Sequence, residues 1–393
     1  MTGFKEKIDK RIWRIIKDYF YLQRIADTPI IQNINCSSNP DQKKVLICYL
    51  TFSFLHNWEN TKIGRTQTFE ILKIVNLFSA FGFSIDIVAW NDIKVLDLIR
   101  SKKYYLIFGF GETFYQMTTL QPEAISVLYM TENHPEFSYQ EEKKRLDYYY
   151  SRHGKKLKIT RSGKFYKLHQ FNRTYCHVIS MGETSLLSKQ YSDPYFIFPT
   201  GLINPTYNFK YKHHIEARKN FIWLGSTGAL HKGLDLLLDI FNQRDDIVLH
   251  ICGLEKKEKR RLKVPVRNNI IDYGHIDINS DLFLGLIEKC SFIILPSCSE
   301  ASSTSITTGM LHGLIPVVTK DAGFNRLGKN AIFLEDFLLS YLGKKIVDIS
   351  NLDPVELDNF SHQVYDYARR TFTIQVFENN FRNIIQDILK SAI

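Results

Sequence analysis

The 393-residue chain contains no hydrophobic run of the roughly 18 to 20 apolar residues that a membrane-spanning helix needs. Its N-terminus also lacks the apolar core and the small-residue cleavage site of a signal peptide. These two absences exclude a spanning helix and a conventional secretion signal, so we expect a protein that is made and kept in the cytoplasm. At this length one hydrophobic core is rarely sufficient, and we expect two domains.

Cysteine is sparse and scattered. The six cysteines form no Cys-x-x-Cys pair, and Cys48, Cys252 and Cys290 lie inside apolar segments, where a thiol acts as a small hydrophobic group. The sequence therefore predicts neither a disulfide framework nor a zinc site, and we expect no bound metal.

The net charge of +10 is concentrated in two segments. Residues 141–173 contain 11 Lys and Arg against 3 Asp and Glu, and residues 1–25 contain 7 against 3. Such clusters attract phosphate, anionic lipid or nucleic acid, although a solvated surface gives the same pattern. In the N-terminal segment the apolar residues share one helical face with lysine and arginine around it, which is typical of an interfacial membrane helix; packing on its own domain is the alternative. The apolar residues are Phe4, Ile8, Ile12, Ile15, Tyr19 and Leu22.

Short apolar segments alternate with amphipathic ones along the whole chain. This pattern predicts parallel sheets covered by helices on both faces, that is, an α/β fold with two doubly wound domains. The expected strands are 43–50, 84–90, 104–110, 125–130, 176–180 and 195–199 in the first half, and 220–225, 246–253, 269–274, 290–296 and 314–319 in the second.

Two helices are expected from their apolar spacing. Residues 65–82 place Phe69, Leu72, Val75 and Phe78 three residues apart, and the C-terminal segment has a similar stripe that we expect to be core. The stripe consists of Ile374, Phe377, Phe381, Ile384 and Ile388.

A domain boundary is expected where periodicity is lost, in the proline-containing segment 199–214. We predict an N-terminal domain at 1–205, a C-terminal domain at 206–373, and a final helix at 374–393 that packs back toward the N-terminal domain.

Ligands of open α/β sheets bind beyond the carboxyl ends of the strands, which directs attention to the loop after 290–296. There Glu300 precedes a group of small hydroxyl residues: Ser302, Ser303, Thr304 and Ser305. Their hydroxyls and the backbone N–H groups that open the next helix suit a diphosphate. Glu300 suits sugar hydroxyls instead, since a carboxylate only accepts hydrogen bonds; a charge that merely stabilises a helix dipole is the alternative.

A second loop follows the first strand of the same domain, at residues 225–239. Gly225 and Ser226 open it, and Lys232 stands at the start of a helix, where it would neutralise a phosphate. Two such loops on neighbouring strands would grip one diphosphate.

The order of the segments "FIWLGSTGALHKGLDLLLDIF", "VLHICG", "IIDYGHI" and "LIEKCSFIILPSCSEASSTSITTGMLHGLIPVVT" resembles the nucleotide-sugar domain of the retaining GT-B glycosyltransferases of family four. The resemblance covers about 100 residues well and the N-terminal half only loosely. It identifies Glu300 with the first glutamate of the Glu-x7-Glu motif, which contacts the donor sugar, and Lys232 with the lysine that binds the diphosphate. Gly313 and Pro316 match the glycine and proline that end the motif.

The resemblance implies a GT-B fold, with two Rossmann-like domains facing a central cleft, and sugar transfer from a nucleotide-sugar donor with retained anomeric configuration. The expected acceptor is a saccharide or a lipid-linked saccharide of cell-surface polysaccharide biosynthesis, so an enzyme bound peripherally to the inner face of the cell membrane is a further expectation. The donor is a substrate, and no cofactor is expected. Because the chain contains no Asp-x-Asp, we expect a metal-independent hexosyltransferase.

The sequence departs from the family pattern at two positions. Thr308 replaces the second glutamate, which in the family binds the ribose, and Ser226 replaces the arginine that usually follows the first strand. Thr308 still offers a hydroxyl to the ribose. These losses leave a catalytically silent GT-B partner or sugar-binding subunit as the alternative function.

In the N-terminal half the resemblance is looser. His134 follows an expected strand and resembles the family histidine near the transferred sugar, so we assign it a catalytic role; His56 is a second candidate for the active cleft. Gly64 and Arg65 stand where the family often has two glycines.

Two other interpretations remain. Gly109-x-Gly111 after a strand, with Glu132 about 20 residues on, is typical of a dinucleotide site, but Phe114 takes the third glycine position. The tyrosines of 148–150, within the basic segment, are suited to stacking on bases, yet no nucleic-acid module surrounds them, so no nucleic-acid partner is expected.

Overall fold

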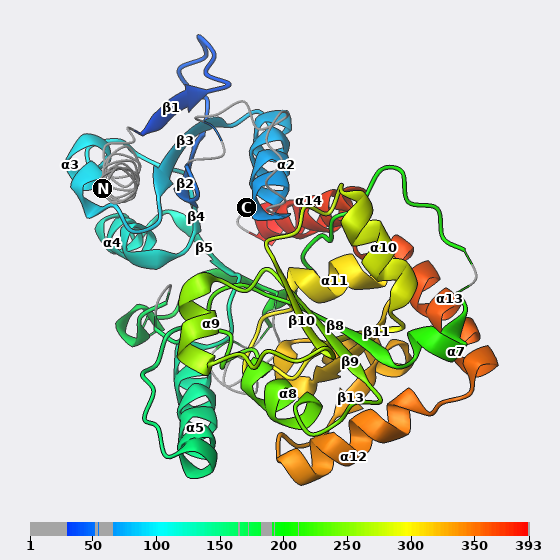
Figure 1. The fold of residues 1–393 in the computed structure, drawn as a ribbon. Coiled ribbons are helices and arrows are strands. Elements are labelled where there is room, and N and C mark those ends of the chain that lie inside the picture. The colour runs from blue at the N-terminus through cyan, green and yellow to red at the C-terminus, as the bar shows by residue number, and fades with distance from the viewer. Residues whose placement is uncertain are drawn as a thin grey trace, which may run out of the picture. The chain divides into compact units, whose positions relative to one another are not determined.

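The structure is a computed structural model that describes residues 30–51, 54, 66–163, 166–171, 173–181, 191, 193–210 and 212–391 (Figure 1). The chain divides into two compact units: Met1–Thr61 with Val75–Ser126, and Lys62–Ile74 with Val127–Ile393. Residues 1–25, His56, Gly64 and Arg65 lie outside the described residues, so the predictions made for them stay predictions. Among the described helices, none combines the length and the apolar character that crossing a bilayer requires.

The first unit is built on a small sheet in which β2 pairs in parallel with β3 and β4, while β1 adds an antiparallel edge to β3. Its strands are β1 (Ile31–Ile34), β2 (Lys44–Tyr49), β3 (Ser84–Ala89) and β4 (Leu106–Gly109). Its helices are α3 (Leu96–Ile99) and α4 (Gly111–Leu120). Two elements cross the boundary between the units: α2 (Thr66–Ala80) and β5 (Ile125–Met130).

In the second unit, β5 continues into a parallel arrangement with β6 (His177–Ser180) and β7 (Tyr195–Phe196). A separate six-stranded sheet has the order β10-β9-β8-β11-β12-β13 and is parallel throughout. Its strands are β8 (Asn220–Leu224), β9 (Val248–Cys252), β10 (Ile270–Gly274), β11 (Phe292–Leu295), β12 (Ile315–Thr319) and β13 (Ile332–Leu334). The helices of this unit are α5 (Pro135–His153), α7 (His214–Ala217), α8 (Leu234–Phe241), α9 (Lys256–Leu262), α10 (Asp281–Lys289), α11 (Thr304–Met310), α12 (Leu339–Ser350), α13 (Pro354–Thr371) and α14 (Ile374–Ser391).

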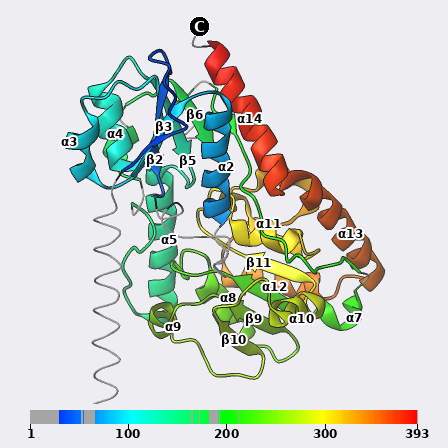
Figure 2. The same ribbon diagram turned by 90° about the horizontal axis from the view of Figure 1, so that it is seen from above.

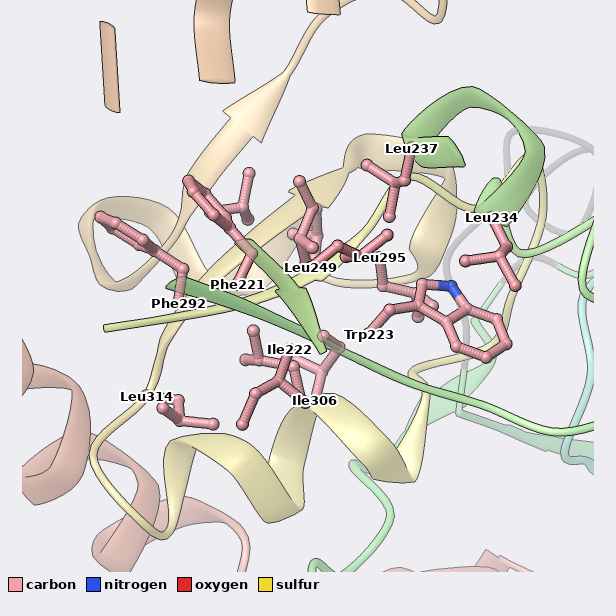
Figure 3. Packing of buried hydrophobic residues seen from close by; sticks show 14 of the residues in the cluster. Phe221, Ile222, Trp223, Leu234, Leu237, Leu249, Phe292, Leu295, Ile306 and Leu314 are labelled. Atoms are coloured by element: carbon pink, nitrogen blue, oxygen red, sulfur yellow. The ribbon is translucent and has the colours of Figure 1, made fainter. Parts of the chain in front are cut away.

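The six-stranded sheet is apolar on both faces because helices cover both. Every residue of β11 is buried, as expected for a central parallel strand. Figure 3 shows Leu234 and Leu237 of α8 packed on one face and Ile306 of α11 on the other. The predicted α/β fold with two parallel-dominated sheets is therefore confirmed.

Each predicted strand contains an observed strand, but the sequence missed β1 and β13. The first is a partly exposed edge strand of sequence IQNI, and the second has three residues. Neither produces the continuous apolar run that revealed the other strands.

The apolar spacing predicted the helix α2 but did not identify its buried face. Phe69 is 48% exposed, whereas Ile71, Ile74, Val75 and Phe78 are buried. A strict three-residue repeat drifts around a helix of 3.6 residues per turn, so that Phe69 and Phe78 lie on opposite faces. In the C-terminal helix three residues of the predicted stripe, Phe377, Phe381 and Ile388, are buried, and Ile385 takes the place predicted for Ile384.

In the second unit α14 lies beside the first half of α2 in both ribbon views (Figures 1 and 2). Lys73 Nζ lies 2.8 Å from Glu378 Oε2, and the Phe381 ring meets Tyr129 edge-on at 6.3 Å between centroids. The Tyr195 hydroxyl donates to Asp387 over 2.6 Å. The predicted domain boundaries themselves stay predictions.

The Gly109-x-Gly111 sequence has a packing explanation in the first unit. A Cβ on Gly109 would lie 2.1 Å from the Cys48 carbonyl oxygen, and one on Gly111 would lie 2.5 Å from that of Trp90. Both glycines have positive φ, which favours glycine. Close backbone approach thus accounts for the motif without a dinucleotide.

Candidate functional site

The two loops singled out in the sequence meet in the second unit. Glu300 lies beyond the end of β11, and Lys232 lies just before α8, in the loop that follows β8. Since β8 and β11 are adjacent parallel strands, their carboxyl ends share one edge of the sheet. Lys232 Nζ donates to Glu300 Oε1, and both side chains are buried.

A third charged group, Arg161, reaches the same carboxylate. Arg161 Nη2 lies 3.9 Å from Glu300 Oε2 and 2.5 Å from Glu132 Oε1. Burial alone would lower the pKa of Arg161, but Glu132, Glu300 and Glu142 raise it above its ordinary value. The guanidinium therefore stays charged between two carboxylates.

The fourth group is His231, whose two ring nitrogens both face acceptors. Nε2 faces the Ser299 carbonyl oxygen, while Nδ1 lies 3.4 Å from Cys298 Sγ and 3.6 Å from Glu142 Oε2. Burial by itself would lower the pKa of His231, but the Cys298 sulfur and the Glu142 and Glu300 carboxylates raise it to about 10. This arrangement indicates a positively charged imidazolium.

Glu142 organises the segment that carries Arg161. Its carboxylate accepts the backbone N–H groups of Thr160 (2.8 Å), Arg161 (3.3 Å) and Ser162 (2.7 Å), and the Ser162 hydroxyl (2.6 Å). Burial raises the pKa of Glu142, but His231 and these hydrogen bonds outweigh it and keep the pKa well below its usual value.

The cluster as a whole is electrically balanced. Burial raises the pKa of Glu300, but Lys232, Arg161 and His231 together keep it below the ordinary range, so Glu300 is a carboxylate at neutral pH. The three cations face the three carboxylates of Glu300, Glu132 and Glu142. In a buried site of this composition the charges interact more strongly than they would in water, because the local dielectric constant is low.

The start of α5 is joined to the Glu300 loop. Asn133 Nδ2 donates to the Glu300 carbonyl oxygen over 3.4 Å, and the Ser138 and Ser299 hydroxyls lie 2.8 Å apart. His134 is the N-cap of α5: its Nδ1 accepts the Glu136 N–H over 3.3 Å, and its ring packs edge-on against Phe171. His134 thus has a capping role beside the site, and its catalytic role stays a prediction.

The predicted phosphate-binding hydroxyls have mixed surroundings. Ser302 is buried with φ of 61°, and its hydroxyl lies 2.7 Å from the carbonyl oxygens of both Met181 and Gly323. Ser303 is the N-cap of α11, Thr304 is its first residue, and the Ser303 and Ser305 hydroxyls lie 2.8 Å apart. The Ser302 hydroxyl therefore hydrogen-bonds to the backbone of its own protein and has a structural role.

On the other loop, the Gly225 N–H donates to the Cys252 carbonyl over 2.9 Å, and the Ser226 side chain is exposed. Thr308 is buried in α11, where its hydroxyl oxygen accepts the Leu202 N–H over 3.0 Å. The structure does not bring Thr308 into the charged cluster, and its binding of a ribose stays a prediction.

The sequence missed Arg161, His231 and Glu142 as members of the site. His231 stands next to Lys232, and the other two lie in the basic segment 141–173. That segment is not simply a solvated face, because Arg145 donates to the Pro296 carbonyl over 3.0 Å and Arg152 pairs with Asp235 and Asp239. Nothing in the local sequence distinguishes these arginines from exposed ones.

A metal site is a separate question. No group of three His, Cys, Asp or Glu side chains suited to a metal ion occurs within the described parts of the chain. The cations of the cluster are instead chemically suited to phosphate oxygens.

Comparison with known proteins gives the class of fold. Residues 218–348, which include β8 to β13, match the family model described as "Glycosyl transferases group 1". No curated protein matches the chain. Among solved structures, sucrose-phosphate synthase from Thermosynechococcus elongatus is similar over 89% of this chain and 100% of that chain, with 11% identity and a TM-score of 0.61.

Two further structures support the same fold. Alr3699/HepE from Anabaena, solved in complex with UDP and glucose, is similar over 88% of this chain and 100% of that chain, with 13% identity and a TM-score of 0.56. WaaG, described as a glycosyltransferase involved in lipopolysaccharide biosynthesis, is similar over 87% of this chain and 99% of that chain, with 12% identity and a TM-score of 0.56. The fold is therefore that of the GT-B proteins, with two Rossmann-like domains.

Proposed function

We propose that this protein is a retaining, metal-independent glycosyltransferase of the hexosyltransferase type, which moves a sugar from a nucleotide-sugar donor to a saccharide or lipid-linked saccharide. The observation that carries the proposal is the buried pair of Glu300 and Lys232 at the carboxyl ends of two adjacent parallel strands. This pair lies inside the segment that matches the glycosyltransferase family model. HepE, which shares the fold, was solved with UDP and glucose, which supports a nucleotide sugar as donor.

In the proposed reaction Lys232 and Glu300 have different roles because they carry opposite charges. Lys232 neutralises the diphosphate, which is the leaving group, and thereby stabilises the charge that develops as the glycosidic bond breaks. Glu300 accepts hydrogen bonds from the hydroxyls of the sugar and orients it. The retained configuration rests on the family resemblance, and the absence of a metal requirement rests on the lack of an Asp-x-Asp sequence.

The proposed acceptor and location follow from a similar structure and from the charge pattern of the sequence. WaaG acts in lipopolysaccharide biosynthesis, which favours a cell-surface polysaccharide as the product. A lipid-linked acceptor requires work at a membrane face, so we propose reversible attachment to anionic lipid through the basic segments 1–25 and 141–173. Cosedimentation with anionic liposomes at low salt, and release at high salt, would support this proposal. Equal binding to neutral liposomes would contradict it.

One observation favours the alternative of a catalytically silent partner. The Thr308 hydroxyl is already occupied by the Leu202 N–H, and Ser226 carries no charge. The two positions that depart from the family pattern thus offer the donor little.

The decisive experiment is a donor panel of UDP-, GDP- and ADP-sugars with hydrolysis and transfer as readouts. Glu300→Gln should lower turnover roughly 10- to 1000-fold, because the carboxylate that orients the sugar is lost. Glu335→Gln is the matched control, since that exposed carboxylate pairs with Lys320 on the surface of the same unit. If the wild type neither hydrolyses nor transfers the sugar of any donor, the proposed glycosyltransferase activity is overturned and the catalytically silent partner is favoured.

A further inference from the structure

Arg161 enters the site from outside the segment that matches the glycosyltransferase family model. It lies in the stretch that follows α5, and its backbone N–H is one of three that bind the Glu142 carboxylate. Glu132 then anchors the guanidinium at 2.5 Å. Arg161 is thus fixed at both its backbone and its side chain.

The Arg161 side chain runs along the loop that carries Lys232. A Cβ placed on Gly228 would lie 3.6 Å from Arg161 Cβ and from its Cδ, which is ordinary contact distance. The guanidinium therefore approaches Glu300 from the side of the loop between β8 and α8. Arg161 and Lys232 come from distant parts of the sequence and converge on one carboxylate.

Exposure distinguishes the two cations. The Lys232 and Glu300 side chains are 8% and 6% exposed, whereas those of Arg161 and Glu132 are 18% and 20% exposed. Arg161 and Glu132 also line a pocket together with Asn133 and Ser138. This pocket has a volume of only about 20 Å³, room for one water molecule, so it is the greater exposure of its side chain that makes Arg161 the more accessible of the two cations.

The contacts that Arg161 makes with Glu132 and with Glu300 differ in kind. The Glu132 contact is a short charge-assisted hydrogen bond, whereas 3.9 Å from Glu300 is beyond hydrogen-bond distance. The Glu300 contact is therefore electrostatic and can be exchanged for another anion without moving the guanidinium from Glu132. A guanidinium also binds phosphate oxygens with two parallel N–H groups, which an ammonium cannot do.

We propose that Arg161 binds the donor phosphate that carries the sugar, and that donor binding transfers Lys232 and Arg161 from Glu300 to the diphosphate. This exchange frees the Glu300 carboxylate to accept hydrogen bonds from the sugar only when the diphosphate is in place. The inference rests on the proposed function, because it assumes a nucleotide-sugar donor. It adds Arg161 to the binding residues and makes the action of Glu300 dependent on the diphosphate.

The exchange predicts opposite effects of two variants on nucleotide binding. Arg161→Gln should weaken nucleoside diphosphate binding roughly 10- to 100-fold and change monophosphate binding less than about threefold, since one charge-assisted contact to the outer phosphate is lost. Arg161→Lys should restore part of the loss. Glu300→Gln should strengthen diphosphate binding several-fold, on the order of 3- to 10-fold, because the two cations no longer have to leave a carboxylate.

The test is isothermal titration of the full-length wild type and variants with UDP, GDP and ADP and the matching monophosphates, using the pair that the wild type binds best. Arg152→Gln is the matched control, because this buried guanidinium pairs with Asp235 and Asp239 and takes no part in the cluster. Arg152→Gln should reduce the stability of the protein and leave its affinities for the nucleoside diphosphate and monophosphate unchanged.

The outcomes separate the two proposals. Suppose that the wild type binds a nucleoside diphosphate. If Arg161→Gln weakens the binding of diphosphate and monophosphate equally, or weakens the binding of neither, the Arg161 proposal is overturned and the proposed function remains. If the wild type binds a diphosphate and shows the predicted effects but transfers no sugar, the proposed function fails and the phosphate contact of Arg161 stands. If the wild type binds no nucleoside diphosphate, both are overturned.

Discussion

Replacing Glu142 by glutamine should be among the most destabilising single changes in this protein that keep side-chain size. The carboxylate is fully buried, and it accepts three backbone N–H groups and the hydroxyls of Thr160 and Ser162 while facing the His231 imidazolium. A glutamine keeps one oxygen but turns an NH2 group toward donors. At least one N–H of residues 160–162 therefore loses its acceptor, and the imidazolium loses its counter-charge.

The expected size of the effect follows from these contacts. Removing one partner of a buried ion pair costs about 3 to 5 kcal/mol, and each hydrogen bond to a charged group contributes roughly 1.5 to 3 kcal/mol. We expect a loss of about 3 to 5 kcal/mol near neutral pH, because the glutamine retains part of the hydrogen bonding. For a unit of this size the melting temperature should fall by on the order of 10 °C.

The pH dependence gives the experiment a second readout. The pKa of Glu142 is lowered in the fold, so its stabilisation is present above its unfolded pKa, about 4.3, and is lost as the pH falls through the lower folded value. The pKa of His231 is raised to about 10, so its stabilisation is complete below its unfolded pKa, about 6.5, and is lost as the pH rises toward 10. The stability difference between wild type and Glu142→Gln should be largest between about pH 5 and 6.5 and smaller at both ends.

Differential scanning calorimetry at pH values below about 5, between about 5 and 6.5, and above about 6.5 measures the stability difference between the two proteins. Glu141→Gln is the control one residue away; since Glu141 pairs with the exposed Lys144, this substitution should cost less than about 1 kcal/mol. Equal melting temperatures for Glu142→Gln and Glu141→Gln, or a difference that does not vary with pH, would refute the reasoning.

Two further predictions concern buried groups outside the charged cluster. Thr308→Val should cost about 1 to 3 kcal/mol in denaturant unfolding, because the part-buried Leu202 N–H loses its acceptor, and should leave nucleoside diphosphate affinity unchanged; a selective loss of that affinity would instead restore Thr308 as a donor ligand. Burial raises the pKa of Glu70 to about 7 despite the Thr200 N–H that it accepts, so the folded state retains a proton that the unfolded state releases between about pH 4.5 and 7, and stability contributed by this group falls as the pH rises through that window. Glu70→Gln should therefore raise the melting temperature at pH 8 and give a smaller gain at pH 5, and an equal gain at both pH values would contradict the assignment.

The sequence alone was sufficient to locate β8 to β12, five of the six strands of the six-stranded sheet. Strands such as β11 are buried on both faces, so their apolar runs identify them without knowledge of their neighbours. The buried faces of helices could not be identified in this way. The three-residue spacing from Phe69 to Phe78 does not indicate which side of α2 meets the core. The edge strand β1, half-exposed and polar, gave no signal of its own.

Of the residues in the candidate site, some were identified from the sequence and others only from the structure. The positions of Glu300 and Lys232 followed from the sequence, since parallel strand order places the loops after β8 and β11 at one edge of the sheet. Arg161 and Glu142 were decided only by the tertiary structure. A charged side chain has the same local sequence pattern whether it is solvated or buried in an ion pair, and the contacts that distinguish the two cases are made by residues far away along the chain.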